Sequence, residues 1–126
     1  MEELTRDDII NLLFMGVEVL NLSVVVNDAG VSSLVEGVLG KEIRVLSVFL
    51  SSFSATTAYF VNASDNSNVT QEYNLPSMQF HYPMWYPDAP HFRTIEGSGL
   101  SIFNQTENSG LRVDLAYCYS DPGTAL

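Results

Sequence analysis

Residues 40–62, which read GKEIRVLSVFLSSFSATTAYFVN, are the stretch of this sequence that decides the fold. After Gly40 the stretch contains neither proline nor glycine, and it is rich in the β-branched and aromatic residues that favour strands. It therefore predicts two long strands that meet at residues 52–55 and form a β-hairpin.

The first of these two strands has apolar residues at positions of both parities, and successive side chains of a strand point to opposite faces. One face is expected to carry Ile43, Val45, Phe49 and Phe53, with Ser47 and Ser51 between them, and the other to carry Arg44, Leu46, Val48 and Leu50. A strand with one solvated face alternates more cleanly between apolar and polar residues. We therefore expect the second face to be covered, either by another part of the chain or by another subunit.

The composition fits one acidic domain. The chain has 126 residues, enough for a single buried core, and its 15 acidic and 5 basic residues give a net charge of −10. This charge argues against a nucleic acid or an anionic membrane as the partner, and it suits a soluble surface or a basic partner.

The single cysteine, Cys118, excludes an internal disulfide and a cysteine-based zinc site, and we expect it to be a small buried apolar residue. Residues 1–20 begin with acidic residues, so we expect no secretory signal there. Four sequons for N-glycosylation occur in the chain, and we attribute them to chance: they begin at Asn21, Asn62, Asn68 and Asn104.

Residues 1–20 are expected to form a short helix or an arm. Thr5 is placed to cap a helix over residues 6–15, and apolar residues occupy most of its circumference. They are Ile9, Ile10, Leu12, Leu13, Phe14 and Met15. Such a helix either packs over its own sheet or grips a neighbouring molecule, and the sequence favours neither reading.

The rest of the chain reads as strands and turns, with a β domain over residues 21–120 and a tail over residues 121–126. Besides the two strands above, strands are expected at residues 22–27, 33–38, 69–75, 77–82, 99–104 and 111–119. The last one alternates without a fault, with Leu111, Val113, Leu115, Tyr117 and Tyr119 inward and Arg112, Asp114, Ala116 and Cys118 outward. This pattern predicts an all-β fold, a single antiparallel β-sandwich of about eight strands with jelly-roll-like connectivity.

The sequence gives no positive sign of an enzyme, so we assign no catalytic residue, cofactor or metal. His81 and His91 flank Asp88, but the prolines between them leave the geometry of a metal site undefined. A structural role for both histidines is favoured. Neither a nucleophile elbow nor a phosphate-binding glycine loop is present.

Residues 82–92, YPMWYPDAPHF, form an irregular loop rich in aromatic residues and proline. Its aromatic side chains could stack on a sugar or a protein partner, and Trp85, Tyr86 and His91 are the candidates for exposed contacts. The favoured alternative is that Trp85 and Phe92 plug one open end of the sandwich, because a small core needs large side chains.

Four segments taken together resemble small virion proteins of tailed bacteriophages. They are GKEIRVLSVFLS (40–51), ATTAYFVN (55–62), HYPMWYPDAPHFRTIEGSGLSIFN (81–104) and GLRVDLAYCYS (110–120). The resemblance covers roughly residues 20–120. It implies a β-sandwich head decoration (cement) protein, or a related head or tail accessory protein, which is commonly trimeric.

The leading functional expectation is therefore a capsid decoration protein. As a homotrimer it would bind the major capsid protein on the phage head surface and stabilise the shell, after synthesis in the host cytoplasm. The candidate interface residues are Ile9, Ile10, Leu13, Phe14, Leu46, Val48 and Leu50. One alternative is a tail or fibre module that binds a host surface glycan, and another is an acidic inhibitor of a host nucleic-acid enzyme.

Overall fold

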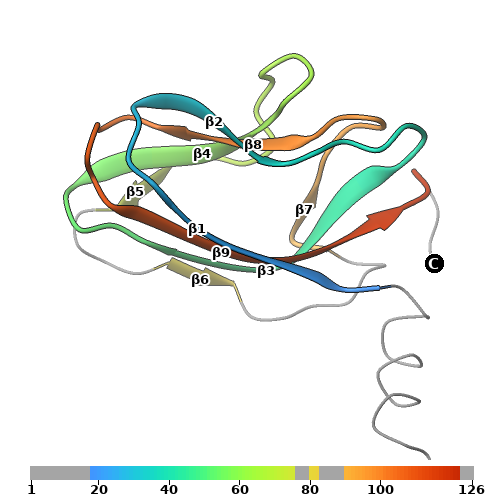
Figure 1. Ribbon diagram of the computed structural model, residues 1–126, viewed down its shortest axis with the longest axis horizontal. Coiled ribbons are helices and arrows are strands. Elements are labelled where there is room, and N and C mark those ends of the chain that lie inside the picture. Colours follow the sequence, from blue (N-terminus) through green and yellow to red (C-terminus); the bar gives the residue numbers. More distant parts are fainter. Residues whose placement is uncertain (1–17, 76–79, 83–89, 123–126) are drawn as a thin grey trace, which may run out of the picture.

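The computed structural model describes residues 18–75, 80–82 and 90–122, and in this part of the chain it shows nine strands in two antiparallel sheets packed face to face (Figure 1). Sheet A has the order β1-β9-β3-β6, with β7 also paired to β3, and sheet B has the order β2-β8-β4-β5. Nowhere in these residues does a helix have the length and apolarity needed to cross a membrane.

The strands of sheet A are β1 (Leu20–Val26), β3 (Glu42–Ser51), β6 (Phe80–Tyr82), β7 (Phe92–Arg93) and β9 (Leu111–Ser120). The strands of sheet B are β2 (Gly30–Val35), β4 (Thr56–Asn62), β5 (Tyr73–Leu75) and β8 (Leu100–Asn104).

The connectivity is that of a jelly roll. Strands β1 to β4 pair in turn with β9, β8, β6 and β5, as if one long antiparallel ribbon had been rolled up. Rolling the ribbon brings β9 beside β3 and β8 beside β4, which completes the two sheets. The predicted antiparallel β-sandwich with jelly-roll-like connectivity is confirmed.

The edge of sheet A beyond β3 consists of two pieces. The first piece, β6, pairs with residues 48–50 of β3, and the second, β7, pairs with residues 44–45. Because β9 occupies the other edge of β3, both pieces lie on the same side. The aromatic stretch between them therefore interrupts a single edge strand.

The predicted hairpin between the two long strands is wrong. Both strands exist, but β3 belongs to sheet A and β4 to sheet B, so the chain crosses between the sheets at residues 52–55. This connection lacks the Asn-Gly or Asp-Gly pair that favours a tight hairpin. Its backbone is held by the β8–β9 loop instead: the N–H groups of Phe53 and Ser54 donate to the carbonyl of Ser109 at 2.8 and 3.0 Å.

The predicted division of β3 into two faces is also wrong. Its pairing with β9 shifts by one residue between Val45 and Ser47, as a β-bulge produces. The extra residue moves all later side chains to the opposite face. Val48 and Leu50 consequently join Ile43 in the core between the sheets.

The outer face of sheet A is buried toward one end of β3 and β9. The buried residues there are Glu42, Arg44, Leu46, Ala116, Cys118 and Ser120. Since this burial is found in a single chain, the cover of the second face comes from the chain itself. No other subunit is required for it.

A buried asparagine closes one end of the sandwich. The side-chain oxygen of Asn104, at the end of β8, accepts hydrogen bonds from the hydroxyls of Thr56 at 2.6 Å and Ser109 at 3.1 Å. Its amide nitrogen donates to the carbonyls of Asp28 at 3.2 Å and Thr106 at 3.1 Å. One side chain thus joins β4 to the β1–β2 and β8–β9 loops.

Asn62, at the end of β4, has the corresponding position at the opposite end. Its Nδ2 donates to the hydroxyl of Ser67 at 3.0 Å, and its Oδ1 accepts from the backbone N–H of Ile95 at 2.9 Å. Both asparagines are buried. Two of the four sequons therefore begin at side chains that are hydrogen-bonded inside the folded protein.

We predict that Asn104→Ala destabilises the fold by about 2 to 4 kcal/mol, because it leaves several buried polar groups without partners at about 1 to 3 kcal/mol each. The control Asn74→Ala removes an exposed side chain whose Oδ1 accepts a hydrogen bond from the Thr57 hydroxyl at 2.9 Å, and it should cost about 0.5 kcal/mol or less. Urea unfolding followed by circular dichroism measures both. Equal effects of the two substitutions would contradict the proposed role of Asn104.

Candidate binding surfaces

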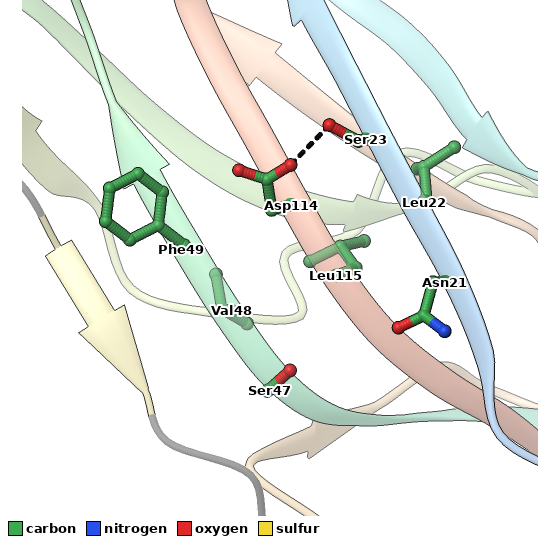
Figure 2. A pocket seen from close by; sticks show the side chains of 8 residues that line it. All are labelled: Asn21, Leu22, Ser23, Ser47, Val48, Phe49, Asp114 and Leu115. Carbon is green, nitrogen blue, oxygen red and sulfur yellow. Dashed lines mark hydrogen bonds between the residues drawn. The ribbon is translucent and has the colours of Figure 1, made fainter.

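A groove of about 320 Å³ crosses the outer face of sheet A (Figure 2). It spans β1, β9 and β3, and it is lined by Asn21, Leu22, Ser23, Ser47, Val48, Phe49, Asp114 and Leu115. We call it the sheet A groove.

Cross-strand register brings the polar residues of the groove together from three strands. One outward row across the three strands consists of Ser23, Asp114 and Phe49, and the next consists of Asn21, Ala116 and Ser47. Four polar residues of the two rows line the groove: Ser23, Asp114, Asn21 and Ser47. Ala116 is buried and is not among the lining residues.

Asp114 is the one carboxylate among the described lining residues, and two neighbours hold it in place. The hydroxyl of Ser23 donates to its Oδ1 at 2.5 Å, and Nε of Arg112 donates to its Oδ2 at 2.9 Å. Both partners come from the strands of the sheet itself, so the carboxylate orientation is fixed before any ligand arrives.

A smaller pocket of about 210 Å³ lies at the β4–β5 side of sheet B. The described residues that line it are all uncharged: Ala55, Thr56, Thr57, Asn74, Leu75, Gln105 and Thr106. Thr56 is already engaged by Asn104, so this pocket offers fewer uncommitted polar groups.

A buried ion pair lies on the covered part of the outer face of sheet A. Nε of Arg44 is 2.7 Å from Oε1 of Glu42, and Nη1 of the exposed Arg93 is 3.5 Å from the same oxygen. Arg44 Nη2 also donates to the carbonyl of Asp121 at 3.3 Å. A buried charge requires such partners, so we assign this cluster a structural role.

Cys118 lies opposite Arg44 in the register of β3 and β9, and it is buried as predicted. Burial raises the pKa of its thiol, although the Ser120 hydroxyl and the Arg44 charge act in the opposite direction. The thiolate is therefore disfavoured in the folded protein.

We predict that stability falls above roughly pH 8.5, where the unfolded chain loses the thiol proton and the folded chain, with its raised pKa, retains it. Below that pH both states keep the proton and the effect vanishes. Urea unfolding at pH 7.5 and 9.5 should show that wild type loses more stability over this interval than Cys118→Ala does. Parallel losses in the two proteins would show that Cys118 does not contribute.

Two large apolar side chains are almost wholly exposed, one at each end of β3. Leu39, in the β2–β3 connection, is 97% exposed, and Phe53, in the β3–β4 connection, is 91% exposed. Val38 and Ile95 are exposed apolar residues as well. Their two loops are joined by a hydrogen bond, in which the N–H of Gly97 donates to the carbonyl of Lys41 at 2.8 Å.

The three described members of the predicted interface do not lie on one face of β3. Leu46 is buried on the outer face of sheet A, whereas Val48 and Leu50 are core residues and expose no side chain to another subunit. The remaining four, Ile9, Ile10, Leu13 and Phe14, lie outside the described residues.

The aromatic loop is described only at its end. Trp85 and Tyr86 lie outside the described residues, while His91 is half-buried and its backbone N–H donates to the Val45 carbonyl at 3.0 Å. Phe92 packs against the core with its ring centroid 4.8 Å from that of Phe60. Phe92 is thus packed against the core, which agrees with its part in the favoured alternative, and the part of Trp85 stays a prediction.

Of the three residues weighed as a metal site, His81, Asp88 and His91, the structure describes only the side chain of His91. Among the described residues no group of three or more histidine, cysteine or acidic side chains is arranged to hold a metal ion. The side chains of His81 and Asp88 are outside that set.

The sheet A groove was missed by the sequence reading, because its residues come from strands that are far apart in the chain. The available signal was Asp114, a carboxylate on the outward face of a strand with faultless alternation. What could not be read was that β1 and β3 would place Asn21 and Ser47 beside it.

Comparisons of the chain with protein-family models, curated proteins and solved structures gave no significant match in any of the three.

Proposed function

We propose that this protein is a structural virion protein of the head decoration type, which forms homotrimers on a phage head and fastens neighbouring major capsid subunits. The observation that carries the proposal is the jelly-roll connectivity, which recurs in viral capsid domains. One fold hosts many functions, so the surface must also fit the role.

The exposed apolar side chains suit a bridging role. Leu39 and Phe53 flank the two ends of β3, a strand of 10 residues that spans roughly 33 Å at about 3.3 Å per residue. One molecule can therefore offer an apolar contact at each end. A shell with many such bridges gains stability from contacts that are individually weak.

Both side chains are presented by hydrogen-bonded loops. The Phe53 connection is tied to Ser109 through two backbone bonds, and the turn at Leu39 is closed by the N–H of Lys41 donating to the Val38 carbonyl at 3.0 Å. Docking on such loops orders few additional residues, so less conformational entropy is lost on binding.

We predict that the purified protein is a trimer, with a mass in light scattering of about three times 13.9 kDa. Each chain carries a net charge of −10, so association should strengthen as salt screens the repulsion between chains. A monomer at micromolar concentration in both low and moderate salt would contradict the trimer.

We predict that Leu39→Asp and Phe53→Asp each weaken binding to heads assembled without this protein by about tenfold or more, since burial of either side chain is worth about 1.5 to 3 kcal/mol. Co-sedimentation of labelled protein with the heads measures this loss. The control Val31→Asp alters a side chain that is 49% exposed on β2, a strand of sheet B, whereas β3 belongs to sheet A, and it should bind normally. Wild-type retention of both end variants would overturn the bridging proposal.

A further inference from the structure

We propose that the sheet A groove is a binding site for a neutral carbohydrate. This proposal is independent of the virion role, because the groove is lined by residues of β1, β3 and β9 (Figure 2) and not by the loops that carry Leu39 and Phe53.

The polar groups of the groove match the hydroxyl groups of a sugar. Each sugar hydroxyl both donates and accepts, so a suitable site supplies both functions at close spacing. The carboxylate of Asp114 accepts, the amide of Asn21 donates and accepts, and the hydroxyl of Ser47 does either, while the hydroxyl of Ser23 donates to Asp114 and keeps its accepting lone pairs. They come from three adjacent strands and border one depression.

Phe49 adds an apolar border. It is the register partner of Asp114, and Figure 2 shows its ring on the β3 side of that carboxylate.

The groove is also ordered before binding. Asp114 is held by Ser23 and Arg112, and its strand β9 is paired on both sides, with β1 and with β3. A ligand therefore meets a fixed carboxylate and does not have to order a loop, which keeps the entropic cost of binding low.

Other ligand classes fit less well. An anion would meet the Asp114 carboxylate and a chain of net charge −10, while the nearby Arg112 is already bonded to Asp114. A metal ion would find one carboxylate among the described lining residues, fewer than hard cations require. The volume of about 320 Å³ lies at the lower limit of small-molecule sites, roughly 300 Å³, and suits a mono- or disaccharide unit.

Titration of the full-length, ¹⁵N-labelled protein tests the proposal, with glucose, galactose, mannose, N-acetylglucosamine and lactose as probes. We expect at least one sugar to shift the backbone amide signals of residues 21–23, 47–49 and 113–115 with millimolar half-saturation. If no sugar shifts them, or if the shifts map to another part of the protein, the proposal is wrong.

Variants separate specific recognition from a general effect. Asp114→Asn and Asn21→Ala should each weaken binding of the responding sugar by about tenfold, because each removes hydrogen bonds to it. Asn74→Ala, in the uncharged pocket of sheet B, is the matched control and should leave binding unchanged. Unaltered binding in both groove variants would overturn the assignment, even if the sugar shifts the expected signals.

Discussion

The jelly roll depends on closing the two ends of the sandwich, and two buried asparagines do this. Asn104 and Asn62 end neighbouring antiparallel strands of sheet B, so they lie at opposite ends of the core. A short amide can bond with several groups at once, and that matters where the chain crosses between sheets and backbone groups lose their ladder partners. The bonds of Asn104 to Thr56 and Ser109 are buried, and in such a water-poor place a hydrogen-bond network is strong when complete and costly when a member is lost.

The bulge in β3 is the second constraint. Without it, Ile43 and Val45 would share a face with Phe49, and Val48 would point away from the core. With it, apolar residues on both sides of the bulge face the opposite sheet. The outer face then holds Arg44 and Leu46, which the same chain covers. The buried part of this outer face, at Arg44 and Leu46, is therefore not a surface that would hold a neighbouring subunit.

The features of the fold that depend on nearby residues could be predicted from the sequence. The strand segments, the inward residues of β9 and the all-β class follow from alternation and turn residues. The pairing of β3 could not be predicted in this way. Whether β3 and β4 share a sheet is decided by long-range contacts with β9, which is the last strand in the sequence. The predicted orientation of Val48 and Leu50 was wrong for a similar reason, since the bulge exists only in the pairing of β3 with β9. The sheet A groove could not be predicted for both reasons. Its residues lie on three strands, and they become neighbours only through the pairing of β1 and β3 with β9.

The positions of the candidate surfaces are compatible with one another. Contacts through Leu39 and Phe53 would use the loops at the ends of β3, whereas the sheet A groove is lined by residues within β1, β3 and β9. A molecule fixed at its ends can keep this face accessible, and the acidic charge of the chain would then repel anionic polymers without opposing a neutral glycan. The scaffold itself need not change between the two contacts, since each rests on elements that are already hydrogen-bonded in the single chain.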